Sequence, residues 1–402
     1  MEWITRPLGE ITSYMAKGIP PKYTEEETEN TVRVLNQKCN RNFTISYADS
    51  RIHDCTQKKV PSDKLLKKGD VLINSTGTGT AGRVAQMMEI PIPTTIDGHM
   101  ILLRPSKEMD AFYYGYAVKA HQAQIETLAE GSTGQTEINR NRLQTEVMIT
   151  YPEDKKVQAG IASFLWDIDR KIEVNNNVNK NLSEQAEALL QKAIDEAKDV
   201  KISTIGDIAD VKGGKRLPKG VSLQTEPNDH PYIRIRDLNE SCFVQLTEAF
   251  EYVDDETQKI ISRYIVSTKD VLISIVGTIG LCSIVHESLN NANLTENCVK
   301  LTNLQKVSPE YLYLFVNSQE GQNAIKQGTV GAVQPKLPIK NIQAISIPIL
   351  SKTDMEKLNG CLKPFFEQIS ENMAENSRLI SLRDSLLPKL MSGELDVSEL
   401  EI

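Results

Sequence analysis

The chain has 402 residues, of which 40% are hydrophobic and 25% are charged, and its formal net charge is −8. This composition is ordinary for a soluble protein, the length favours two or three domains, and no apolar run approaches the roughly 20 residues needed to cross a bilayer. The acidic balance counts against a nucleic-acid binder but does not exclude one, because local basic patches decide such binding.

The N-terminus has no signal-peptide pattern, and the six cysteines are scattered without a C-x-x-C pair. This pattern favours free thiols in a reducing cytoplasm and argues against a zinc ribbon. We therefore expect a cytoplasmic protein.

An internal repeat runs through the chain. Leu8-Gly9-Glu10-Ile11 is matched 197 residues later by Ile205-Gly206-Asp207-Ile208. Gly69-Asp70-Val71-Leu72-Ile73 is matched 200 residues later by Lys269-Asp270-Val271-Leu272-Ile273. A fixed spacing between such landmarks indicates a duplicated structural unit, and the residues between them differ, as expected for variable surface loops.

Each copy predicts the same order of elements. In the first copy these are a strand at Trp3–Ile11, a loop at Lys17–Lys22, strands at Val71–Ile73 and Met100–Arg104, a helix at Ala111–Leu128 and a strand at Val147–Pro152. In the second they are a strand at Val200–Val211, a loop at Lys212–Lys219, strands at Val271–Ile275 and Cys298–Leu301, a helix at Pro309–Gln327 and a strand at Ala344–Pro348. Strands and helices mixed in this way predict an α+β fold with two globular α/β-type domains in tandem.

A heptad pattern follows each globular region. Between Val157 and Ile194, and again 197 residues later, apolar residues recur every seven positions in two rows that lie four residues apart, as in a coiled-coil seam. A helix of about 38 residues would extend about 57 Å, and it could not bury so long a stripe alone. We therefore expect two long antiparallel helices that pair, with boundaries at 1–152 (first domain), 153–199 (central helix), 200–350 (second domain) and 351–402 (C-terminal helix and tail). The predicted seam residues are Ile161, Leu165, Ile168, Ile172, Asn175, Asn179, Leu182, Leu358, Leu362, Phe365, Ile369, Asn372, Asn376 and Leu379.

Four of these seam positions hold asparagine where leucine or isoleucine would stabilise a coiled coil more. A polar residue in a seam costs stability and fixes the register of the two helices. One interpretation is a solvated, splayed stretch midway along the helices, and the other is a ruler whose register fixes the distance between the two globular domains. Arg383, also in the seam, counts against a fully dry interface.

The sequence holds no convincing catalytic or metal-binding pattern. The loop Gly77–Arg83 resembles a phosphate-binding loop but lacks the Gly-Lys-Ser/Thr ending, so a tight turn after a strand is the favoured interpretation and a nucleotide-using enzyme a minor one. The five histidines show no ligand spacing. We therefore predict no catalytic residue, no metal site and no cofactor in this chain.

Basic and polar loops occur at equivalent places in both copies. Gly131–Arg142 and Gly328–Lys340 combine glycine with glutamine, asparagine and cationic side chains, which can contact base edges and phosphates. In the second copy Arg234 and Arg236 alternate, which predicts that both lie on one face of a strand. The candidate DNA-contacting residues are Lys22, Arg83, Gln135, Thr136, Asn139, Arg140, Arg142, Lys212, Lys215, Arg216, Lys219, Arg234, Arg236, Gln334, Lys336 and Lys340.

Over its whole length the chain resembles the specificity subunit of type I restriction-modification systems. The resemblance depends on the tandem order of variable domain and shared helix, and on four stretches. These are Gly69–Ile73, Gly131–Gly134, Phe164–Ile172 and Arg383–Leu395.

This resemblance implies a DNA-recognition subunit without catalytic activity. Each globular domain would be a target recognition domain that reads one half of a bipartite, asymmetric double-stranded DNA target. The helix pair would set the gap and dock two DNA adenine methyltransferase subunits, and motor-nuclease subunits would complete the complex. S-adenosylmethionine, ATP and Mg would then be expected only in the partner subunits. The alternative is a coiled-coil protein–protein adaptor without sequence-specific DNA binding.

Overall fold

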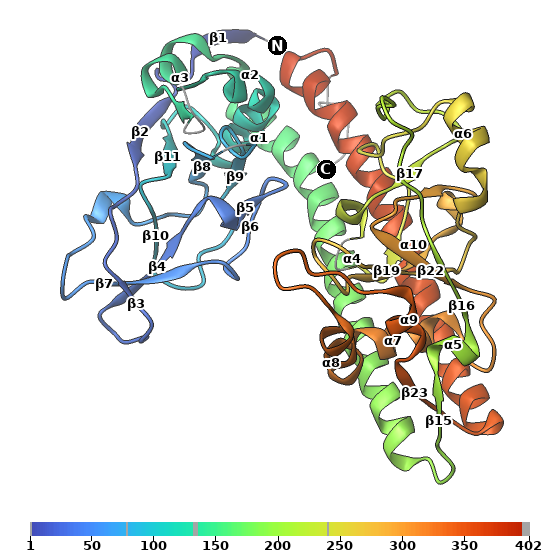
Figure 1. The fold of residues 1–402 in the computed structure, drawn as a ribbon. Helices are drawn as coiled ribbons and strands as arrows, with labels where there is room; N and C mark the ends of the chain where they lie inside the picture. The colour runs from blue at the N-terminus through green and yellow to red at the C-terminus, as the bar shows by residue number, and fades with distance from the viewer. Residues whose placement is uncertain (1, 78, 132–135, 239–240, 396–402) are drawn as a thin grey trace. The chain divides into compact units, whose positions relative to one another are not determined.

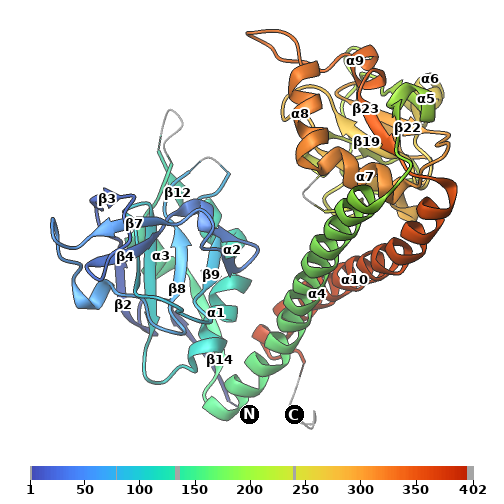
Figure 2. The ribbon, with the colours of Figure 1, turned by 90° about the horizontal axis from the view of Figure 1, so that it is seen from below.

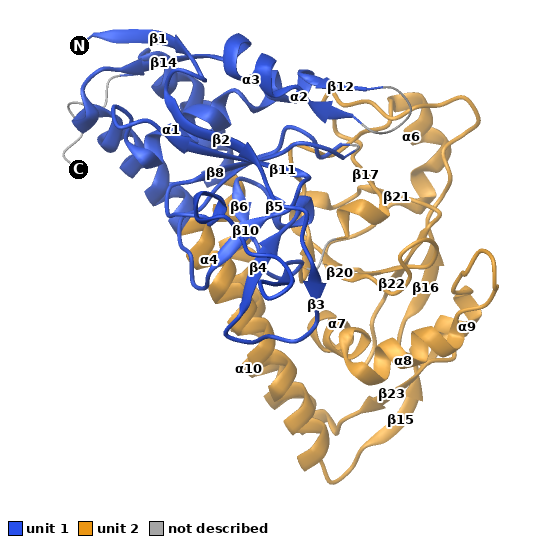
Figure 3. Cartoon of the chain, turned by 90° about the vertical axis from the view of Figure 1, so that its left-hand side faces the viewer, with its two compact units in different colours: residues 1–170, 379–402 blue, residues 171–378 orange. Residues whose placement is uncertain are grey.

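The computed structural model describes residues 2–77, 79–131, 136–238 and 241–395. The chain forms two compact units (Figure 3): unit 1 contains residues 1–170 and 379–402, and unit 2 contains residues 171–378. Helix α4 (Lys155–Glu196) begins in unit 1 and ends in unit 2, while α10 (Lys352–Ser392) begins in unit 2 and ends in unit 1 (Figure 1). The predicted fold, with mixed helix and sheet in tandem units and two long antiparallel helices, is confirmed.

Unit 1 is built around a sheet with the strand order β2-β11-β8-β9 within the described residues. A second sheet has the order β10-β4-β7-β3, and three strand pairs, β1-β14, β12-β13 and β5-β6, complete the unit. The bounds are β1 Trp3–Pro7, β2 Thr12–Lys17, β3 Tyr23–Thr24, β4 Thr31–Leu35, β5 Asn40–Arg41, β6 Thr44–Ile45, β7 Arg51–Asp54, β8 Val71–Asn74, β9 Val84–Gln86, β10 Thr94–Ile96, β11 Met100–Pro105, α1 Ala111–Ala120, α2 Gln122–Thr127, β12 Ala129–Glu130, β13 Glu137–Ile138, α3 Arg140–Glu146 and β14 Met148–Pro152, with short 3-10 turns η1 Gln37–Cys39 and η2 Ser62–Lys64.

Unit 2 repeats this plan with the sheet order β16-β22-β19-β20-β18 and the pairs β15-β23 and β17-β21 in its described part. The bounds are β15 Lys201–Thr204, α5 Ile205–Ile208, β16 Asp210–Gly213, β17 Tyr232–Ile233, η3 Ile235–Asp237, β18 Phe243–Val244, α6 Asp255–Ile261, η4 Ser262–Tyr264, β19 Val271–Ser274, β20 Cys282–Val285, η5 Glu287–Leu289, β21 Asn293–Leu294, β22 Cys298–Thr302, α7 Pro309–Asn317, α8 Gln319–Gly328, α9 Ile339–Gln343 and β23 Ser346–Ile349. Strand β19 therefore occupies in unit 2 the place that β8 holds in unit 1.

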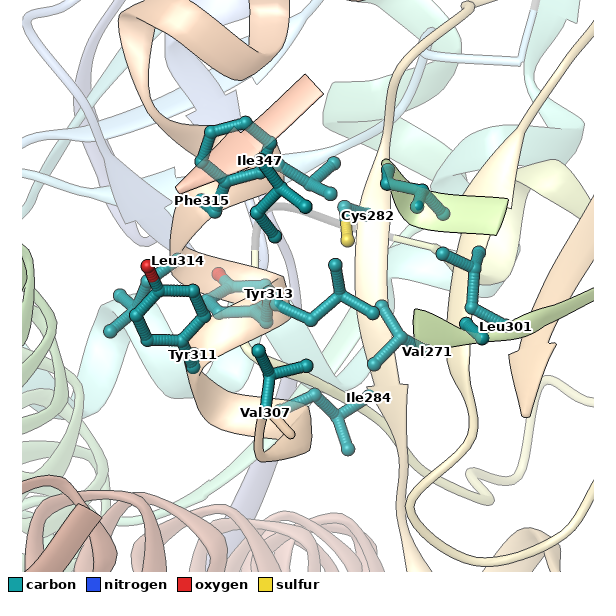
Figure 4. Close-up of a cluster of buried hydrophobic side chains, with 14 of the residues drawn as sticks. Val271, Cys282, Ile284, Leu301, Val307, Tyr311, Tyr313, Leu314, Phe315 and Ile347 are labelled. Atoms are coloured by element: carbon teal, nitrogen blue, oxygen red, sulfur yellow. The ribbon is translucent and has the colours of Figure 1, made fainter. Parts of the chain in front are cut away.

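The core of each unit lies between its central sheet and the apolar helix that follows that sheet's last strand in the chain, α1 in unit 1 and α7 in unit 2. In unit 2, α7 lays Tyr311, Leu314 and Phe315 against Val271 and Ile284 of the sheet (Figure 4). These side chains are almost fully buried, which explains why α7 is apolar on nearly all sides. Helix α1 covers the sheet of unit 1 in the same way with its tyrosines.

The repeated motif before each central strand has a physical cause. The residue that precedes the aspartate has a left-handed backbone, with φ +87° at Gly69 and +70° at Lys269. Asp70 then accepts a hydrogen bond from the Lys67 amide at 2.7 Å and binds Arg104 at 2.8 Å, and Asp270 binds Lys300 at 3.4 Å. The aspartate thus closes the turn and neutralises a cation from the neighbouring strand, while the apolar residues after it fill the sheet.

Four predicted elements are shorter than the sequence pattern indicated. Strand β1 ends at Pro7, so the predicted strand at Trp3–Ile11 was too long. The predicted strand at Val200–Val211 is interrupted by α5, because Thr204 and Asp207 form a capping box that starts a helix. The two predicted apolar helices are each divided in two, at His121 and at Ser318, and the Ser318 side chain caps α8.

Gly69→Ala should lower the free energy of unfolding of unit 1 by about 1–3 kcal/mol. Alanine is strained at this positive φ, and its Cβ would lie 2.9 Å from the Cβ of Ala111. Gly160→Ala should act in the opposite direction by about 0.5–1 kcal/mol, because the added methyl stabilises a helix and would meet no atom within 4 Å. Urea unfolding followed by tryptophan fluorescence measures both, since the chain's two tryptophans, Trp3 and Trp166, lie in unit 1. Shifts of the same sign would contradict this interpretation of the motif.

Candidate nucleic-acid interface and helix seam

In unit 1, three segments converge where the central strand β8 ends. The hairpin strand β13 joins the residues after β8 through a bridge between Thr76 and Glu137 and a 2.8 Å hydrogen bond from Ile138 N to Ser75 O. A Cβ added to Gly77 would lie 2.4 Å from Oε1 of Gln37, so the turn η1 packs on the same strand end. We call this surface the strand-end surface of unit 1.

Unit 2 has the same arrangement at the end of β19. Val276 bridges Lys336, and Leu337 N donates to Ile275 O at 2.9 Å. A Cβ on Gly277 would lie 3.6 Å from Cδ1 of Ile235, in the turn η3. The three segments therefore form a strand-end surface of unit 2, in which every contact has its counterpart in unit 1.

The loop that follows the second strand of each repeat, β2 or β16, reaches this surface as well. Lys215 N donates to Leu294 O at 2.8 Å in unit 2, as Ile19 N donates to Ile96 O at 2.9 Å in unit 1. The loop binds the segment Leu294–Asn297, and that segment is joined to the end of β19 because Asn297 O accepts a 2.8 Å hydrogen bond from Ile275 N. The lysine-rich loop predicted from the sequence thus lies at the strand end.

Arg234 and Arg236 do not share a strand face, which corrects the prediction. Strand β17 ends at Ile233, and Arg236 lies in the 3-10 turn η3 because the Asp237 carboxylate accepts the amide of Arg234 at 2.7 Å. The two guanidinium groups still converge, because both bind the carboxylate of Glu251. Their equivalents in unit 1 are Asn36 and Lys38, around the turn η1, which the sequence analysis did not single out. The polar residues directly after β4 were the sequence feature that could have indicated this part of the surface.

Several candidate cations are paired with carboxylates of the protein itself. Arg142 lies between Glu146 and Glu130 at 2.7 and 2.6 Å, and these carboxylates raise the pKa of its guanidinium. Arg216 binds Glu296 at 2.7 Å, with its pKa likewise raised, and Lys212 binds Asp210 at 3.0 Å. For Arg142, Arg216, Lys212, Arg234 and Arg236, contact with phosphate competes with an existing ion pair.

Six other candidate cations are exposed and form no ion pair within the described part of the chain. Lys215 also lies over the ring of Tyr264, with Nζ 5.5 Å from the ring centre. Such side chains can neutralise phosphates without breaking an ion pair. They are Lys22, Arg140, Lys215, Lys219, Lys336 and Lys340.

The remaining candidates have mixed surroundings. Asn139 caps α3: its Oδ1 accepts hydrogen bonds from Asn141 N and Arg142 N, so this oxygen is already used within the protein. Arg83 donates to Gly79 O at 3.0 Å, in the turn predicted at Gly77–Arg83. Gln334 is exposed and Thr136 is half-buried, whereas Gln135 lies outside the described residues.

The part of the helix seam that belongs to unit 1 is apolar with one charged contact. Ile161 and Leu165 of α4 pack in one cluster with Leu387 and Leu390 of α10. Arg383 binds Asp169 at 2.7 Å, and the two side chains are only 14% and 16% exposed. Burial alone would lower the pKa of Arg383, but the nearby carboxylates keep it above its ordinary value. Tyr116 of α1 donates to the same Asp169 at 2.6 Å, which joins the seam to the globular part of unit 1.

The part of the seam in unit 2 contains the predicted asparagines. Asn175 Nδ2 donates to Asn376 Oδ1 at 2.9 Å, and Asn372 Nδ2 donates to Asn179 Oδ1 at 2.7 Å. Asn175 also binds Glu375 and, with Lys171, holds the pKa of that carboxylate below its ordinary value. We call this set the polar layer. Because Asn175, Asn372 and Asn376 are at most 7% exposed, the layer is a hydrogen-bonded part of the interface and not a splayed, solvated stretch.

The apolar seam residues differ in burial. Phe366, which was not predicted, is 2% exposed and packs edge-on against Phe243 and Tyr313, so α10 also covers the globular part of unit 2. The buried predicted residues are Ile161, Leu165, Ile168, Leu358, Leu362 and Ile369, and the partly buried ones are Ile172, Leu182, Phe365 and Leu379.

Across the described ranges, no group of three His, Cys, Asp or Glu residues is placed to hold a metal ion. No helix within those ranges is long and apolar enough to span a membrane.

Comparison with known proteins identifies the two repeats. The family model of the type I restriction modification DNA specificity domain matches residues 1–184 and 197–375. The chain is 23% identical over 430 residues to the type I restriction enzyme MjaIX specificity subunit of Methanocaldococcus jannaschii, covering 99% of this chain and 95% of that protein. It is 26% identical over 197 residues to the HindI specificity subunit of Haemophilus influenzae, covering 48% of this chain and 41% of that protein.

A solved structure has the same fold. The type I restriction-modification S subunit from M. genitalium aligns over 97% of this chain and 96% of its own, with a TM-score of 0.55 and 18% identity.

Asn175→Leu alone should lower the free energy of unfolding of unit 2 by about 1–3 kcal/mol, because it leaves the buried Oδ1 of Asn376 without its donor. The double variant Asn175→Leu/Asn376→Leu should recover most of this loss, since leucines complete the apolar seam. Chemical unfolding followed by far-ultraviolet circular dichroism, arranged as a double-mutant cycle, measures the coupling. Additive effects would show that the two amides act independently.

Proposed function

The chain belongs to the family defined by the type I restriction modification DNA specificity domain, and we propose that it reads a bipartite, asymmetric DNA target as the specificity subunit of such a complex. Each unit would read one half of the target. Support comes from the two strand-end surfaces, which share their backbone contacts and differ in their side chains. Equal scaffolds with unlike surfaces suit unlike half-sites, because base edges are distinguished by side-chain chemistry.

The charge distribution agrees with this role. The net charge is −8, yet unpaired lysines gather at the strand-end surface of unit 2, where Lys215 and Lys336 are exposed. Phosphate contacts supply sequence-independent affinity, and base contacts supply discrimination. A cationic partner that encloses the DNA would add to the phosphate neutralisation.

The helix pair supports a second part of the proposal. Each long helix passes from one unit into the other, and the polar layer and the Asp169–Arg383 ion pair both fix its register. We infer that this pair sets the unread gap between the half-sites and docks two DNA adenine methyltransferase subunits.

The chemistry would then reside in the partners. Methyltransferase subunits would hold S-adenosylmethionine, and motor-nuclease subunits would hold ATP and Mg. This chain would contribute recognition alone, in the reducing cytoplasm, and all six of its cysteines are free.

Lys215→Ala should weaken binding to every duplex alike and reduce the slope of log K against log salt by about one. The exposed Lys198, in the segment between α4 and β15, is the matched control and should leave the slope unchanged when replaced by alanine. Titrations of the assembled methyltransferase complex at several salt concentrations measure both variants. A change in base preference alone would place Lys215 on a base edge instead.

Insertion of seven residues into both helices, after Arg170 and after Arg378, should lengthen the unread gap and leave both half-sites intact. Seven residues add about 10.5 Å of helix, and a whole heptad keeps the seam aligned. Mapping of methylated adenines across the genome measures the gap directly. An unchanged gap would contradict the proposal that the helix pair sets the distance between the half-sites. If the chain showed no preference for any duplex sequence, the protein–protein adaptor would remain as its role.

A further inference from the structure

A hairpin between α8 and α9 projects from the strand-end surface of unit 2 (Figure 2). Val330 N donates to Lys336 O and Lys336 N donates to Val330 O, both at 2.9 Å, which closes the loop Gly331–Pro335. Gly331 permits the turn, because its φ is +98° and a Cβ there would lie 2.7 Å from Gln334 O. The projection is therefore a short hairpin that is closed by the Val330–Lys336 bridge.

The base of this ribbon is held firmly. Lys336 also bridges Val276, and Leu337 N donates to Ile275 O at 2.9 Å. Leu337 is 1% exposed, and Asn341 Nδ2 donates to Gly328 O at 2.7 Å. The ribbon thus continues the end of the central strand, so its tip is positioned by the sheet.

Apolar side chains follow the exposed side of the ribbon to its tip. Residues directly opposite each other in antiparallel pairs point to the same face, so Val276, Lys336 and Val330 form one row. Val276 is 37% exposed and Val330 is 44% exposed, while Val333 in the tip is 94% exposed. Burial of a valine is favourable, so a valine exposed to water at the tip of the hairpin is not explained by folding.

The equivalent row in unit 1 has the opposite chemistry. Thr76 bridges Glu137, and Glu137 pairs with Glu130 across the hairpin. The segment Gly328–Lys340 contains two lysines and no acidic residue. The two rows occupy the same place in the repeat, so their difference marks a position where the units are adapted to different ligands.

We propose that the hairpin of unit 2 enters the major groove of its half-site and that Val333 packs against the 5-methyl group of a thymine. The inference deepens the proposed function and rests on it. The major groove admits a two-stranded ribbon, and the thymine methyl is the apolar group that base edges present there. Lys336, in the row below the tip, lies on the same projection to meet phosphate or guanine acceptors.

A protein partner fits this projection less well than DNA. Stable protein interfaces bury more than about 1,000 Å² and depend on large aromatic or arginine anchors. Three exposed valines on a narrow hairpin that also carries a lysine offer neither, whereas a contact with one methyl group in a groove needs only the valine at the tip.

The test uses the full chain assembled with its methyltransferase subunits and a duplex that carries the mapped target. Each thymine of both half-sites is replaced in turn by deoxyuridine, which removes only the methyl group. For the wild type we expect about fourfold weaker binding at one position in one half-site, the equivalent of one buried methylene. Val333→Ala should weaken binding to the thymine duplex and abolish the additional loss on the deoxyuridine duplex.

Two variants serve as controls. Ile202→Ala removes another exposed apolar side chain, 70% exposed on β15, and should leave the deoxyuridine effect unchanged. Lys336→Ala should weaken the thymine and deoxyuridine duplexes by the same factor.

Two results would overturn the inference: no position whose deoxyuridine effect depends on Val333, or a Val333→Ala variant that loses its methyltransferase instead. In each of these cases discrimination between the target and a scrambled duplex would preserve the proposed function. Loss of that discrimination in the wild type would reject both.

Discussion

Each long helix carries an apolar stripe that no single helix can bury, and the rest of the structure depends on how that stripe is covered. Within each unit, one segment of α4 packs against one segment of α10, and the globular part of the unit packs against this helix pair. In unit 1 Tyr116 reaches the Asp169–Arg383 ion pair, and in unit 2 Phe366 packs against Phe243 and Tyr313. The helices are thus the common core against which the sheets are fixed, and a change in their register would disturb both units.

Polar groups in this seam are tolerated because each has a partner. Burying an unpaired amide or guanidinium costs more than an apolar contact gains, whereas a paired one selects a single register. Asn175 meets Asn376 and Arg383 meets Asp169, so a shift of the helices by a turn would leave several buried groups unsatisfied. If the helix pair sets the gap between two half-sites, as proposed above, a single register would matter for that function.

The duplication separates scaffold from recognition. Hydrogen bonds such as Ile138 N to Ser75 O and Leu337 N to Ile275 O are the same in both units, since they connect backbone atoms and do not depend on side chains. The side chains on the same backbone diverge, with Glu137 in one unit and Lys336 in the other. One fold can therefore present two different surfaces to DNA, which suits an asymmetric target read by one chain.

The sequence alone was enough to predict two α+β units connected by paired long helices. The signals are the heptads, the 197-residue repeat and the apolar strands, which are local or periodic and therefore visible without coordinates. They also located the seam asparagines, since a polar residue in an apolar row is visible without coordinates. Tertiary structure alone decided that Arg234 and Arg216 are paired, because their partners Glu251 and Glu296 are remote in sequence. It alone decided that η1 and the hairpins meet at the strand ends, and that Val333 remains in water, because a contact between distant segments leaves no periodic trace in the chain.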